Sequence, residues 1–421
     1  METLHKLYEM TAFSSILQNP GSLLMLVIGA ILLYLGIKKE YEPLLLVPIA
    51  FGVILANLPG GGMGVLPGHF IELDGLKHIN ITPEGKEIVI DMPNRYMNLF
   101  EIAHEYGIMN FLYYTLIKTG LLPPIIFMGV GALTDFGPML RNLKLSLFGA
   151  AAQLGIFTVL IIASVVGFTS KEAASLAIIG GADGPTAIYT TIKLAPHLLG
   201  PIAIAAYSYM ALVPVIIPLV VKLTCSEKEL KINMKEMDRL YPPKHQIKNL
   251  RAVKIAFPIV LGIVISFFVP SAVPLLGMLL FGNLLKEIGA NTLRLSDAAS
   301  GAIMNTATIF LGLTVGATMT SEVFLDIKTI GIVVGGFFAF AISVFGGITA
   351  VKIFNLFSKK KINPLIGATG LSAVPMASRV ANDIALKYDS KNHVLQYCMS
   401  SNISGVIGSA VAAGVLISFL S

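Results

Sequence analysis

Residues 180–187 read GGADGPTA, and they interrupt a long apolar region with a carboxylate, a hydroxyl and residues that break helices. Gly181, Gly184 and Pro185 each weaken or end a helix. In hydrocarbon such a break is tolerated only where the freed backbone lines a cavity or is buried in protein. A charge on Asp183 at bilayer depth would cost about 2.5–3.5 kcal/mol unless something compensates it. We predict a Na⁺ or H⁺ site at this break; the alternative is that Asp183 caps a helix in a loop near the membrane surface.

The composition around this stretch is that of a membrane protein. Of 421 residues, 55% are hydrophobic and 13% charged, and the mean hydropathy is +0.79, which leaves too little polar surface for a soluble globule. Forty glycines and 22 prolines indicate close helix contacts and broken helices. Crossing a bilayer takes about 20 helical residues. Apolar runs near that length or longer cover residues 21–37, 43–57, 145–168, 198–221, 255–285, 301–318, 329–356 and 393–420.

The charge pattern describes membrane topology rather than nucleic-acid binding. The net charge is +6, but the basic residues lie between the apolar runs. Residues 222–254 hold nine Lys/Arg against four Asp/Glu, so this connector is predicted to be cytoplasmic. Two cysteines are too few for a disulfide framework, and no histidine lies deep in an apolar run. A histidine-based transition-metal site is therefore not expected.

The chain divides at this basic connector. We predict a first membrane half, 1–222, the connector, 223–254, and a second membrane half, 255–421. A polar excursion over 58–105 interrupts the first half, and its alternating KEIVID stretch predicts a small hairpin outside the membrane. Each half contains one broken segment, at 171–193 and at 363–386.

The two halves resemble each other weakly. Related halves that each contain a glycine- and proline-broken segment are typical of transporters whose site lies where the repeats meet, near the bilayer midplane. We therefore predict an all-α polytopic membrane protein with two inverted repeats and re-entrant or discontinuous helices meeting at an ion site. An offset of 190 residues aligns Gly180 with Gly370, Pro185 with Pro375, Ala187 with Ala377 and Tyr207 with Tyr397.

The second broken segment, NPLIGATGLSAVPMASRVAND at 363–383, differs in its chemistry. It has no acid near the break, but Asn363 and Ser372 offer neutral oxygens. Arg379 follows the proline and would either pair with Asp183 or bind a carboxylate from outside the chain. The alternative is an arginine that extends to the membrane surface from a helix end.

Three more polar residues stand in or beside apolar runs. Asn402 would either join helices or bind a cation. Tyr209 is more often a packed aromatic with one hydrogen bond, although a tyrosine near the site could also move a proton. Asp135, just before a Gly-Pro pair, is expected to cap a helix.

With these residues laid out, the chain resembles the β subunit of the sodium-pumping, biotin-dependent decarboxylases, which act on oxaloacetate, methylmalonyl-CoA, glutaconyl-CoA or malonate. The excursion at 58–105 is longer than the connection usual in that family. The resemblance rests on the motifs IFMGVGALTDFGP, GGADGPTAIY, AYSYMALVP, INPLIGATGLSAVPMASRV and SNISGVIGSAVAAGV, spread from residue 126 to 415.

The resemblance implies that different subunits carry out different steps of the reaction. A carboxyltransferase subunit would move the carboxyl group onto biotin on a carrier protein, and this chain would decarboxylate the carboxybiotin while driving Na⁺ outward. It further implies a small single-span partner, a trimeric core and the cytoplasmic membrane of a prokaryote. The family's ion-linked positions match Asp183, Asn363 and Asn402, and its other functional positions match Tyr209, Gly367, Ser372 and Arg379.

These residues give a mechanistic hypothesis. Na⁺ binds Asp183, the asparagines and broken-helix carbonyls, while Arg379 receives the carboxylate of carboxybiotin from the cytoplasmic side. Lys235 follows a methionine, but it lies in a charged connector without a surrounding β-domain, so we expect the biotin on another polypeptide. The alternatives are a Na⁺-coupled transporter of a small carboxylate without covalent chemistry, and a structural membrane anchor.

Overall fold

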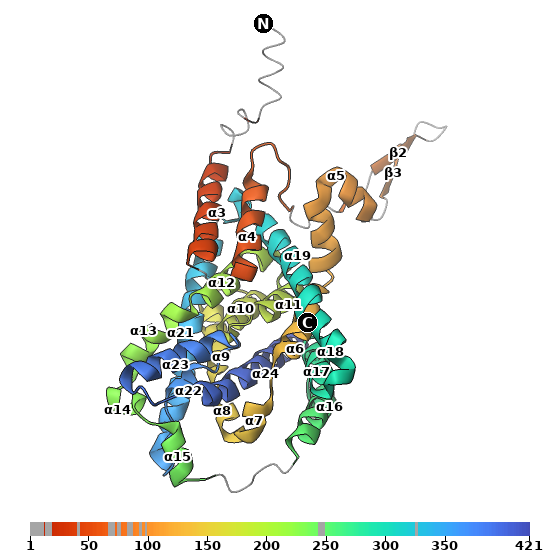
Figure 1. Cartoon of the computed structure of the whole chain (residues 1–421). Coiled ribbons are helices and arrows are strands. Elements are labelled where there is room, and N and C mark those ends of the chain that lie inside the picture. Colours follow the sequence, from red (N-terminus) through yellow and green to blue (C-terminus); the bar gives the residue numbers. More distant parts are fainter. Residues whose placement is uncertain are drawn as a thin grey trace.

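The computed structural model describes residues 12, 19–39, 43–65, 72–73, 77–81, 87–91, 95–96, 99–242, 249–324 and 327–421. Almost all of these residues are helical, and strands occur only between residues 72 and 96 (Figure 1). The predicted all-α class holds for this part of the chain apart from that short excursion.

Seven helical stretches in the described part of the chain are long and apolar enough to cross a membrane. Two bent pairs raise the number to nine if each pair is one span: residues 99–117 with 122–133, bent by 66°, and residues 196–210 with 213–224, bent by 68°. The chain is thus a multi-pass membrane protein. The seven are Gly21–Lys38, Leu143–Val166, Leu250–Phe268, Pro270–Ile288, Ala290–Ala317, Thr329–Phe357 and Leu395–Leu420.

The first half begins with two apolar helices and continues, after the excursion, through six further α-helices before the first break and three after it. The π-helical turn η2 (Tyr113–Ile117) follows α5, and the 3₁₀ turns η3 (Ile178–Gly181) and η4 (Pro196–Leu198) flank α11. The α-helices are α3 (Gly21–Lys38), α4 (Pro43–Asn57), α5 (Leu99–Leu112), α6 (Leu122–Leu133), α7 (Gly137–Arg141), α8 (Leu143–Ala152), α9 (Leu154–Val166), α10 (Ser170–Ala177), α11 (Gly184–Leu194), α12 (Leu199–Ala211) and α13 (Val213–Thr224).

The predicted hairpin in the excursion is confirmed as a strand pair. Strand β2 (Lys77–Ile81) pairs antiparallel with β3 (Glu87–Asp91), with His78 opposite Ile90. A second antiparallel pair joins β1 (Glu72–Leu73) to β4 (Arg95–Tyr96). The remaining parts of the predicted excursion between these strands lie outside the described residues.

The connector and the second half are helical as well. The short turns η5 (Pro270–Ala272), η6 (Ala290–Thr292) and η7 (Ala299–Ile303) join neighbouring helices. The α-helices are α14 (Glu227–Leu230), α15 (Met234–Leu240), α16 (Leu250–Phe268), α17 (Val273–Ile288), α18 (Leu293–Ala298), α19 (Met304–Ala317), α20 (Ser321–Phe324), α21 (Ile327–Phe357), α22 (Leu365–Ala368), α23 (Met376–Tyr388) and α24 (Leu395–Leu420).

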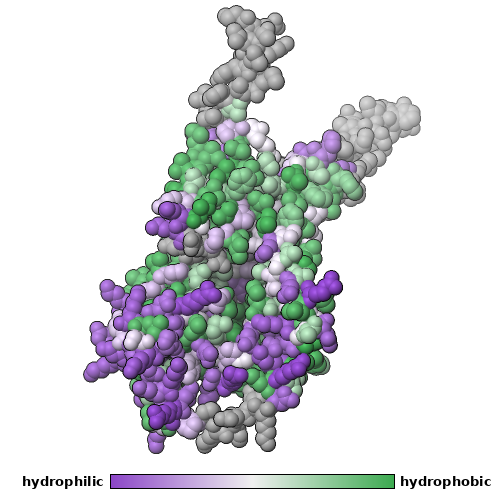
Figure 2. All heavy atoms as spheres, in the orientation of Figure 1, coloured by the Kyte–Doolittle hydropathy of each residue, from purple (hydrophilic) through white to green (hydrophobic). Residues whose placement is uncertain are grey.

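The molecular surface is unlike that of a soluble protein. Phe267 and Phe268 at the end of α16 are 80% and 82% exposed, and Val165 at the end of α9 is 82% exposed. Large exposed apolar surface of this kind fits contact with lipid rather than water. Figure 2 shows hydrophobic residues over α3 and α4 and hydrophilic residues gathered at the opposite end, over α14 and α15.

Close helix contacts explain part of the high glycine content. At the contact of α6 with α17, a Cβ on Gly131 would collide with the Leu279 carbonyl, and one on Gly282 would collide with the Met128 carbonyl. Only residues without side chains let two backbones approach this far, as is common between membrane helices.

Two predicted apolar runs prove to be two helices each. Residues 255–285 are divided between α16 and α17 by a 3₁₀ turn that begins at Pro270. Residues 145–168 form α8 and α9, and the break falls at Gln153. The first division had a local signal, because Pro270 and Ser271 are less apolar than the residues around them and proline tends to end a helix.

The basic connector is bound to the second half by polar contacts. Lys352 on α21 lies 3.1 Å from Glu229 on α14, and the Tyr397 hydroxyl on α24 donates to Asp238 on α15 (2.6 Å). Burial would raise the pKa of Glu229, but hydrogen bonds from Ser226 and Lys352 outweigh it and lower that pKa below its ordinary value. The connector is therefore part of the packed structure rather than a loose linker.

Candidate functional site

The first broken segment folds back on itself at GGADGPTA. The His197 ring lies 3.0 Å from Glu172 Oε1, which brings the start of α10 to the residues just after α11. At the turn, Ala182 has φ +57° and ψ +41°, a left-handed conformation that costs a non-glycine residue about 1–2 kcal/mol. Such backbone conformations persist where the surroundings enforce them, often at functional sites.

The second broken segment also folds back, against the connector. The Asn363 amide donates to the Leu230 carbonyl (2.9 Å), and Asn233 donates to Asp389 (3.3 Å). Both ends of the segment, before α22 and after α23, are thus held by residues 230–233. Residues 369–375 form the non-helical turn between the two helices.

The two turns meet. The Ser372 backbone N–H donates to the Gly181 carbonyl (3.0 Å), and the Ser372 hydroxyl donates to the Ser409 hydroxyl on α24 (2.8 Å). Ser409 in turn donates to Asp183 Oδ2 (3.0 Å). We call these four residues, Gly181, Asp183, Ser372 and Ser409, the junction. These hydrogen bonds bring the two broken segments into contact with each other.

Asp183 is buried at the junction and does not face bulk solvent. The residue is 6% exposed. Its Oδ1 accepts a hydrogen bond from the Thr186 N–H (3.2 Å), so Asp183 caps the start of α11. One carboxylate oxygen therefore caps a helix, while the other accepts a hydrogen bond from Ser409 on α24. The ion site at Asp183 stays a prediction.

Helix α24 carries two polar residues on the face that meets the second segment. Asn402 and Ser409 are two turns apart, so they lie on the same side of the helix. The Asn402 amide donates to the Leu371 carbonyl, and its Oδ1 accepts from the Ser378 hydroxyl (3.2 Å). Asn402 therefore lies beside the second turn, one residue from Ser372.

Several buried oxygens around the junction have no hydrogen-bond partner. They belong to Gln153 (Oε1), Thr186 (Oγ1) and Tyr207 (hydroxyl). The Tyr207 ring packs so closely on Gly184 that a Cβ there would collide with it. Leaving such an acceptor buried and unpaired costs about 1–3 kcal/mol, which a bound cation would offset.

The donor set fits a hard monovalent cation. A carboxylate that is bonded to a hydroxyl, with the Gln153 amide oxygen near the same turn, suits Na⁺, since hard cations prefer oxygen ligands. Within the described residues, no three His, Cys, Asp or Glu side chains gather into a group that could hold a metal ion.

Arg379 lies in the first turn of α23 and is exposed. Its backbone N–H donates to the Pro375 carbonyl (3.1 Å), but within the described part of the chain no ion pair involves its guanidinium. The structure does not pair Arg379 with Asp183. Helix α23 packs against α13 and contacts α14 of the connector, and Arg379 lies at the end of α23 that follows the second turn.

Asn363 is held by the connector rather than by the residues of the junction. Besides Leu230, its amide donates to the Ile232 carbonyl (3.0 Å), and its Oδ1 accepts from the Leu365 N–H (3.0 Å). All of these partners are backbone groups of the connector or of the segment itself.

Tyr209 faces α21 rather than the junction. Its hydroxyl donates to the Val333 carbonyl, and its ring packs against Phe337 with centroids 6.1 Å apart. The interpretation as a packed aromatic with one hydrogen bond is confirmed. Tyr207, on the opposite side of α12, is the tyrosine that lies beside Gly184 at the first turn.

Gly367 is buried at a close helix contact. A Cβ on Gly367 would collide with the Gly347 carbonyl on α21, and a Cβ on Gly347 would collide with the Gly367 carbonyl. The lack of a side chain at Gly367 is thus required by packing in this structure.

Replacing Gly367 by alanine is expected to destabilise the protein by about 1–3 kcal/mol, because neither backbone can move aside freely. Gly347→Ala should have a similar effect, since the same contact is overfilled from the other side. The measurement is the temperature of half-inactivation of the purified complex. A loss of activity with Gly367→Ala at normal thermal stability, absent from Gly347→Ala, would instead place Gly367 in a binding site.

Sequence reasoning missed Ser409 and Gln153. Ser409 lies seven residues after Asn402, and this two-turn spacing of polar residues in an apolar helix was a usable signal. Gln153 lies near the middle of the span 143–166, and a lone amide at that depth was equally visible.

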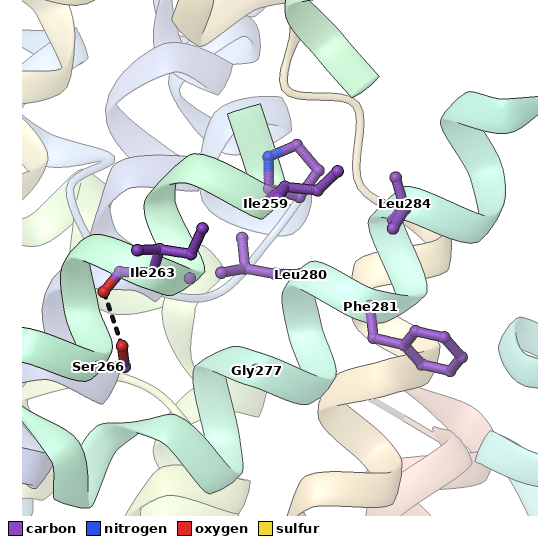
Figure 3. Close-up of a pocket in the computed structure, with 9 residues that line it drawn as sticks. Ile259, Ile263, Ser266, Gly277, Leu280, Phe281 and Leu284 are labelled. Carbon is purple, nitrogen blue, oxygen red and sulfur yellow. Dashed lines mark hydrogen bonds between the residues drawn. The ribbon is translucent and has the colours of Figure 1, made fainter. Parts of the chain in front are cut away.

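Two cavities lie away from these residues. One, of about 340 Å³, is an apolar groove between α16 and α17 lined by residues such as Ile259, Ile263 and Phe281 (Figure 3). Its Ser266 hydroxyl donates to the Ile263 carbonyl (2.7 Å), so the groove offers no free polar group. The other, of about 150 Å³, contains the ion pair of Lys254 with Asp135 (2.6 Å). Asp135 also accepts from the first N–H of α7 (2.8 Å), as predicted for a helix cap.

Comparison with known proteins shows the family of the chain. The chain is 46% identical to the methylmalonyl-CoA decarboxylase subunit beta of Propionigenium modestum, over 99% of both chains. It is 44% identical to the oxaloacetate decarboxylase beta chain of Haemophilus ducreyi, over 95% of both chains. The profile of one family, described as the Na⁺-transporting oxaloacetate decarboxylase beta subunit, matches residues 21–420. The chain therefore belongs to the Na⁺-transporting oxaloacetate decarboxylase beta subunit family.

Proposed function

We propose that this chain moves Na⁺ through the junction of its two broken segments, driven by decarboxylation of carboxybiotin that a partner protein delivers at Arg379. As a member of its family, it is a membrane subunit that couples a decarboxylation to Na⁺ transport. The observation that carries the proposal is the hydrogen-bonded path from the second turn through Ser372 and Ser409 to the buried Asp183.

The two broken segments enter the membrane from opposite sides. Both ends of the first lie near Glu172 and His197, whereas both ends of the second lie at residues 230–233 of the connector. Between His197 and the connector runs the bent pair α12–α13, which is apolar and long enough to cross once. Two re-entrant segments meeting at their tips form the inverted arrangement in which the ion site lies between two repeats.

Na⁺ binds at Asp183 with hydroxyl and amide oxygens. The Ser409 hydroxyl lies 3.0 Å from Asp183 Oδ2 and 3.0 Å from the Val406 carbonyl. It can therefore turn its single proton to Val406 when Na⁺ arrives and offer its lone pairs to the ion. Asn402 is placed beside the second turn to contribute its Oδ1. Asn363 would first have to release its backbone partners in the connector before it could serve as a ligand.

Arg379 receives the carboxylate of carboxybiotin from the connector side, the cytoplasmic side in this proposal. A planar guanidinium binds a carboxylate through two parallel hydrogen bonds. Decarboxylation removes this negative charge from the vicinity of the second segment. The changed charge favours another conformation, in which the junction opens outward. Export against 100 mV costs about 2.3 kcal/mol per charge, so the two events must be linked by this conformational change.

The decarboxylation consumes a proton. Tyr209 is the residue that the sequence suggested for its delivery, with water as the alternative donor. In this conformation its hydroxyl is occupied by the Val333 carbonyl, so delivery would require that bond to open. The carboxyltransferase, the biotin carrier and the small single-span subunit are proposed as partners, around a trimeric core in a prokaryotic cytoplasmic membrane.

Purification of the native complex tests the proposal. A biotin-bearing protein should co-purify with the chain, and Na⁺ uptake by inverted vesicles should stop when avidin blocks the biotin. The same avidin treatment should leave Na⁺ permeability of empty vesicles unchanged. Avidin-insensitive uptake of a small carboxylate together with Na⁺ would overturn the proposal in favour of a secondary transporter without covalent chemistry.

A further inference from the structure

Gln153 lies at the break between α8 and α9, where it contacts three other parts of the chain. Its Nε2 is 3.2 Å from the Gly149 carbonyl, 3.4 Å from the Gly370 carbonyl and 3.4 Å from the Gly405 carbonyl. These belong to α8, to the second turn and to α24. One buried amide therefore connects the first half with both elements of the second half that form the junction.

The carbonyl groups fix the direction of the amide. Reversing it would place the Gln153 oxygen against three backbone oxygens, all of them acceptors without a proton to share. The nitrogen must face those carbonyls, so Oε1 must point the other way. There it is buried and has no hydrogen-bond partner.

The free oxygen of Gln153 points toward the first turn. A Cβ built on Gly181 would lie 3.7 Å from Gln153 Oε1 and 2.9 Å from Ser409 Cβ. Gln153 and Ser409, the residue bonded to Asp183, therefore both lie close to Gly181. Gln153 is 6% exposed, so bulk water does not readily reach Oε1 to supply the missing hydrogen bond.

We propose that Gln153 is a ligand of the transported cation, with its Oε1 completing the oxygen shell beside the junction. Ion binding is then coupled to the second turn and to α24. A cation on Oε1 polarises the amide and strengthens its N–H bonds to Gly370 and Gly405. The inference rests on the proposed function, since it adds a residue to the same ion path.

The test uses the complete, reconstituted complex and measures the Na⁺ concentration that gives half-maximal decarboxylation. Gln153→Met keeps the size of the side chain but removes its ligand oxygen, and it should raise that concentration by about 10-fold or more. Gln153→Glu keeps an oxygen but makes it titratable. Its half-saturating Na⁺ should fall more steeply with rising pH than in the wild type, because protons compete with Na⁺ for the new carboxylate.

Asn283 on α17 provides a matched control. Its amide is also buried, donates to the Thr134 carbonyl (2.8 Å) and has an unpartnered oxygen, but it belongs to the contact of α6 with α17. Asn283→Leu should leave the half-saturating Na⁺ unchanged in whatever complex assembles. The inference is overturned if Gln153→Met leaves the Na⁺ dependence intact, if the control shifts it equally, or if neither Gln153 variant assembles, which would make the residue structural.

The failure of this inference is distinguishable from failure of the proposed function. If Asp183→Asn abolishes Na⁺-dependent activity while Gln153→Met does not alter it, only the role of Gln153 is wrong. If Asp183→Asn leaves Na⁺ dependence intact, the ion path itself is wrong.

Discussion

Replacing Asp183 by asparagine should lower Na⁺-dependent decarboxylation and Na⁺ uptake by about 100-fold or more, since even residues that only support metal ligands contribute about 10- to 100-fold. Asparagine keeps the size and one oxygen of the side chain, but it removes the charge that compensates Na⁺ in a buried site. The measurement is the rate of ²²Na⁺ uptake by vesicles that contain the reconstituted complex, together with the rate of decarboxylation at saturating Na⁺.

Asp135 offers the matched control for this substitution. Its side chain is half exposed and pairs with Lys254 at the far end of α6. A surface pair of this kind contributes about 0–1 kcal/mol, so Asp135→Asn should leave Na⁺ uptake within about two-fold of the wild type. An equal loss of Na⁺ uptake in both variants would mean that the effect is not specific to Asp183. The junction would then not be the ion site.

The second large effect is expected at Arg379. Arg379→Ala should lower decarboxylation by about 100-fold, comparable to the loss of one anion-binding donor in an enzyme site, and higher Na⁺ should not restore it. Arg379→Lys should recover part of the activity at best, because an ammonium keeps the charge but cannot bind a carboxylate through two parallel bonds. Decarboxylation of carboxybiotin by the purified complex is the direct readout.

Arg141 serves as the control for a general loss of positive charge. It is exposed at the end of α7, beside the polar cavity rather than on the second segment. Arg141→Ala should leave carboxybiotin decarboxylation nearly unchanged. If Arg379→Ala instead raises only the Na⁺ concentration needed for half-maximal rate, the guanidinium acts on the ion and not on the carboxylate.

Local sequence correctly predicted the breaks but not every helix boundary. Gly181, Gly184 and Pro185 end helices through their own backbone properties, and the structure breaks at that position. The same holds for the second segment, where residues 369–375 are non-helical. In contrast, the division of α16 from α17 at Pro270 was missed, because the average hydropathy stays high across it, although a proline there can end a helix.

The site was predicted less completely than the fold. The sequence singled out Asp183, Ser372 and Asn402, and the structure places these at or beside the meeting turns. It also singled out Asn363 and Tyr209, whose polar groups are held by the connector and by α21 in this conformation. Residue type identified suitable chemistry in each case, but it could not show which way each side chain faces.

The sequence by itself determined that the chain is a multi-pass membrane protein, that each half contains a broken segment, and that one break carries a carboxylate. These properties are local, since hydropathy, helix breaking and charge belong to a residue and its neighbours. Only the tertiary structure decided that Ser409 reaches across 226 residues of sequence to Asp183 and that Tyr207, not Tyr209, lies at the first turn. Those contacts depend on how packed helices are rotated about their axes, and that rotation is set by side-chain and glycine contacts between distant segments.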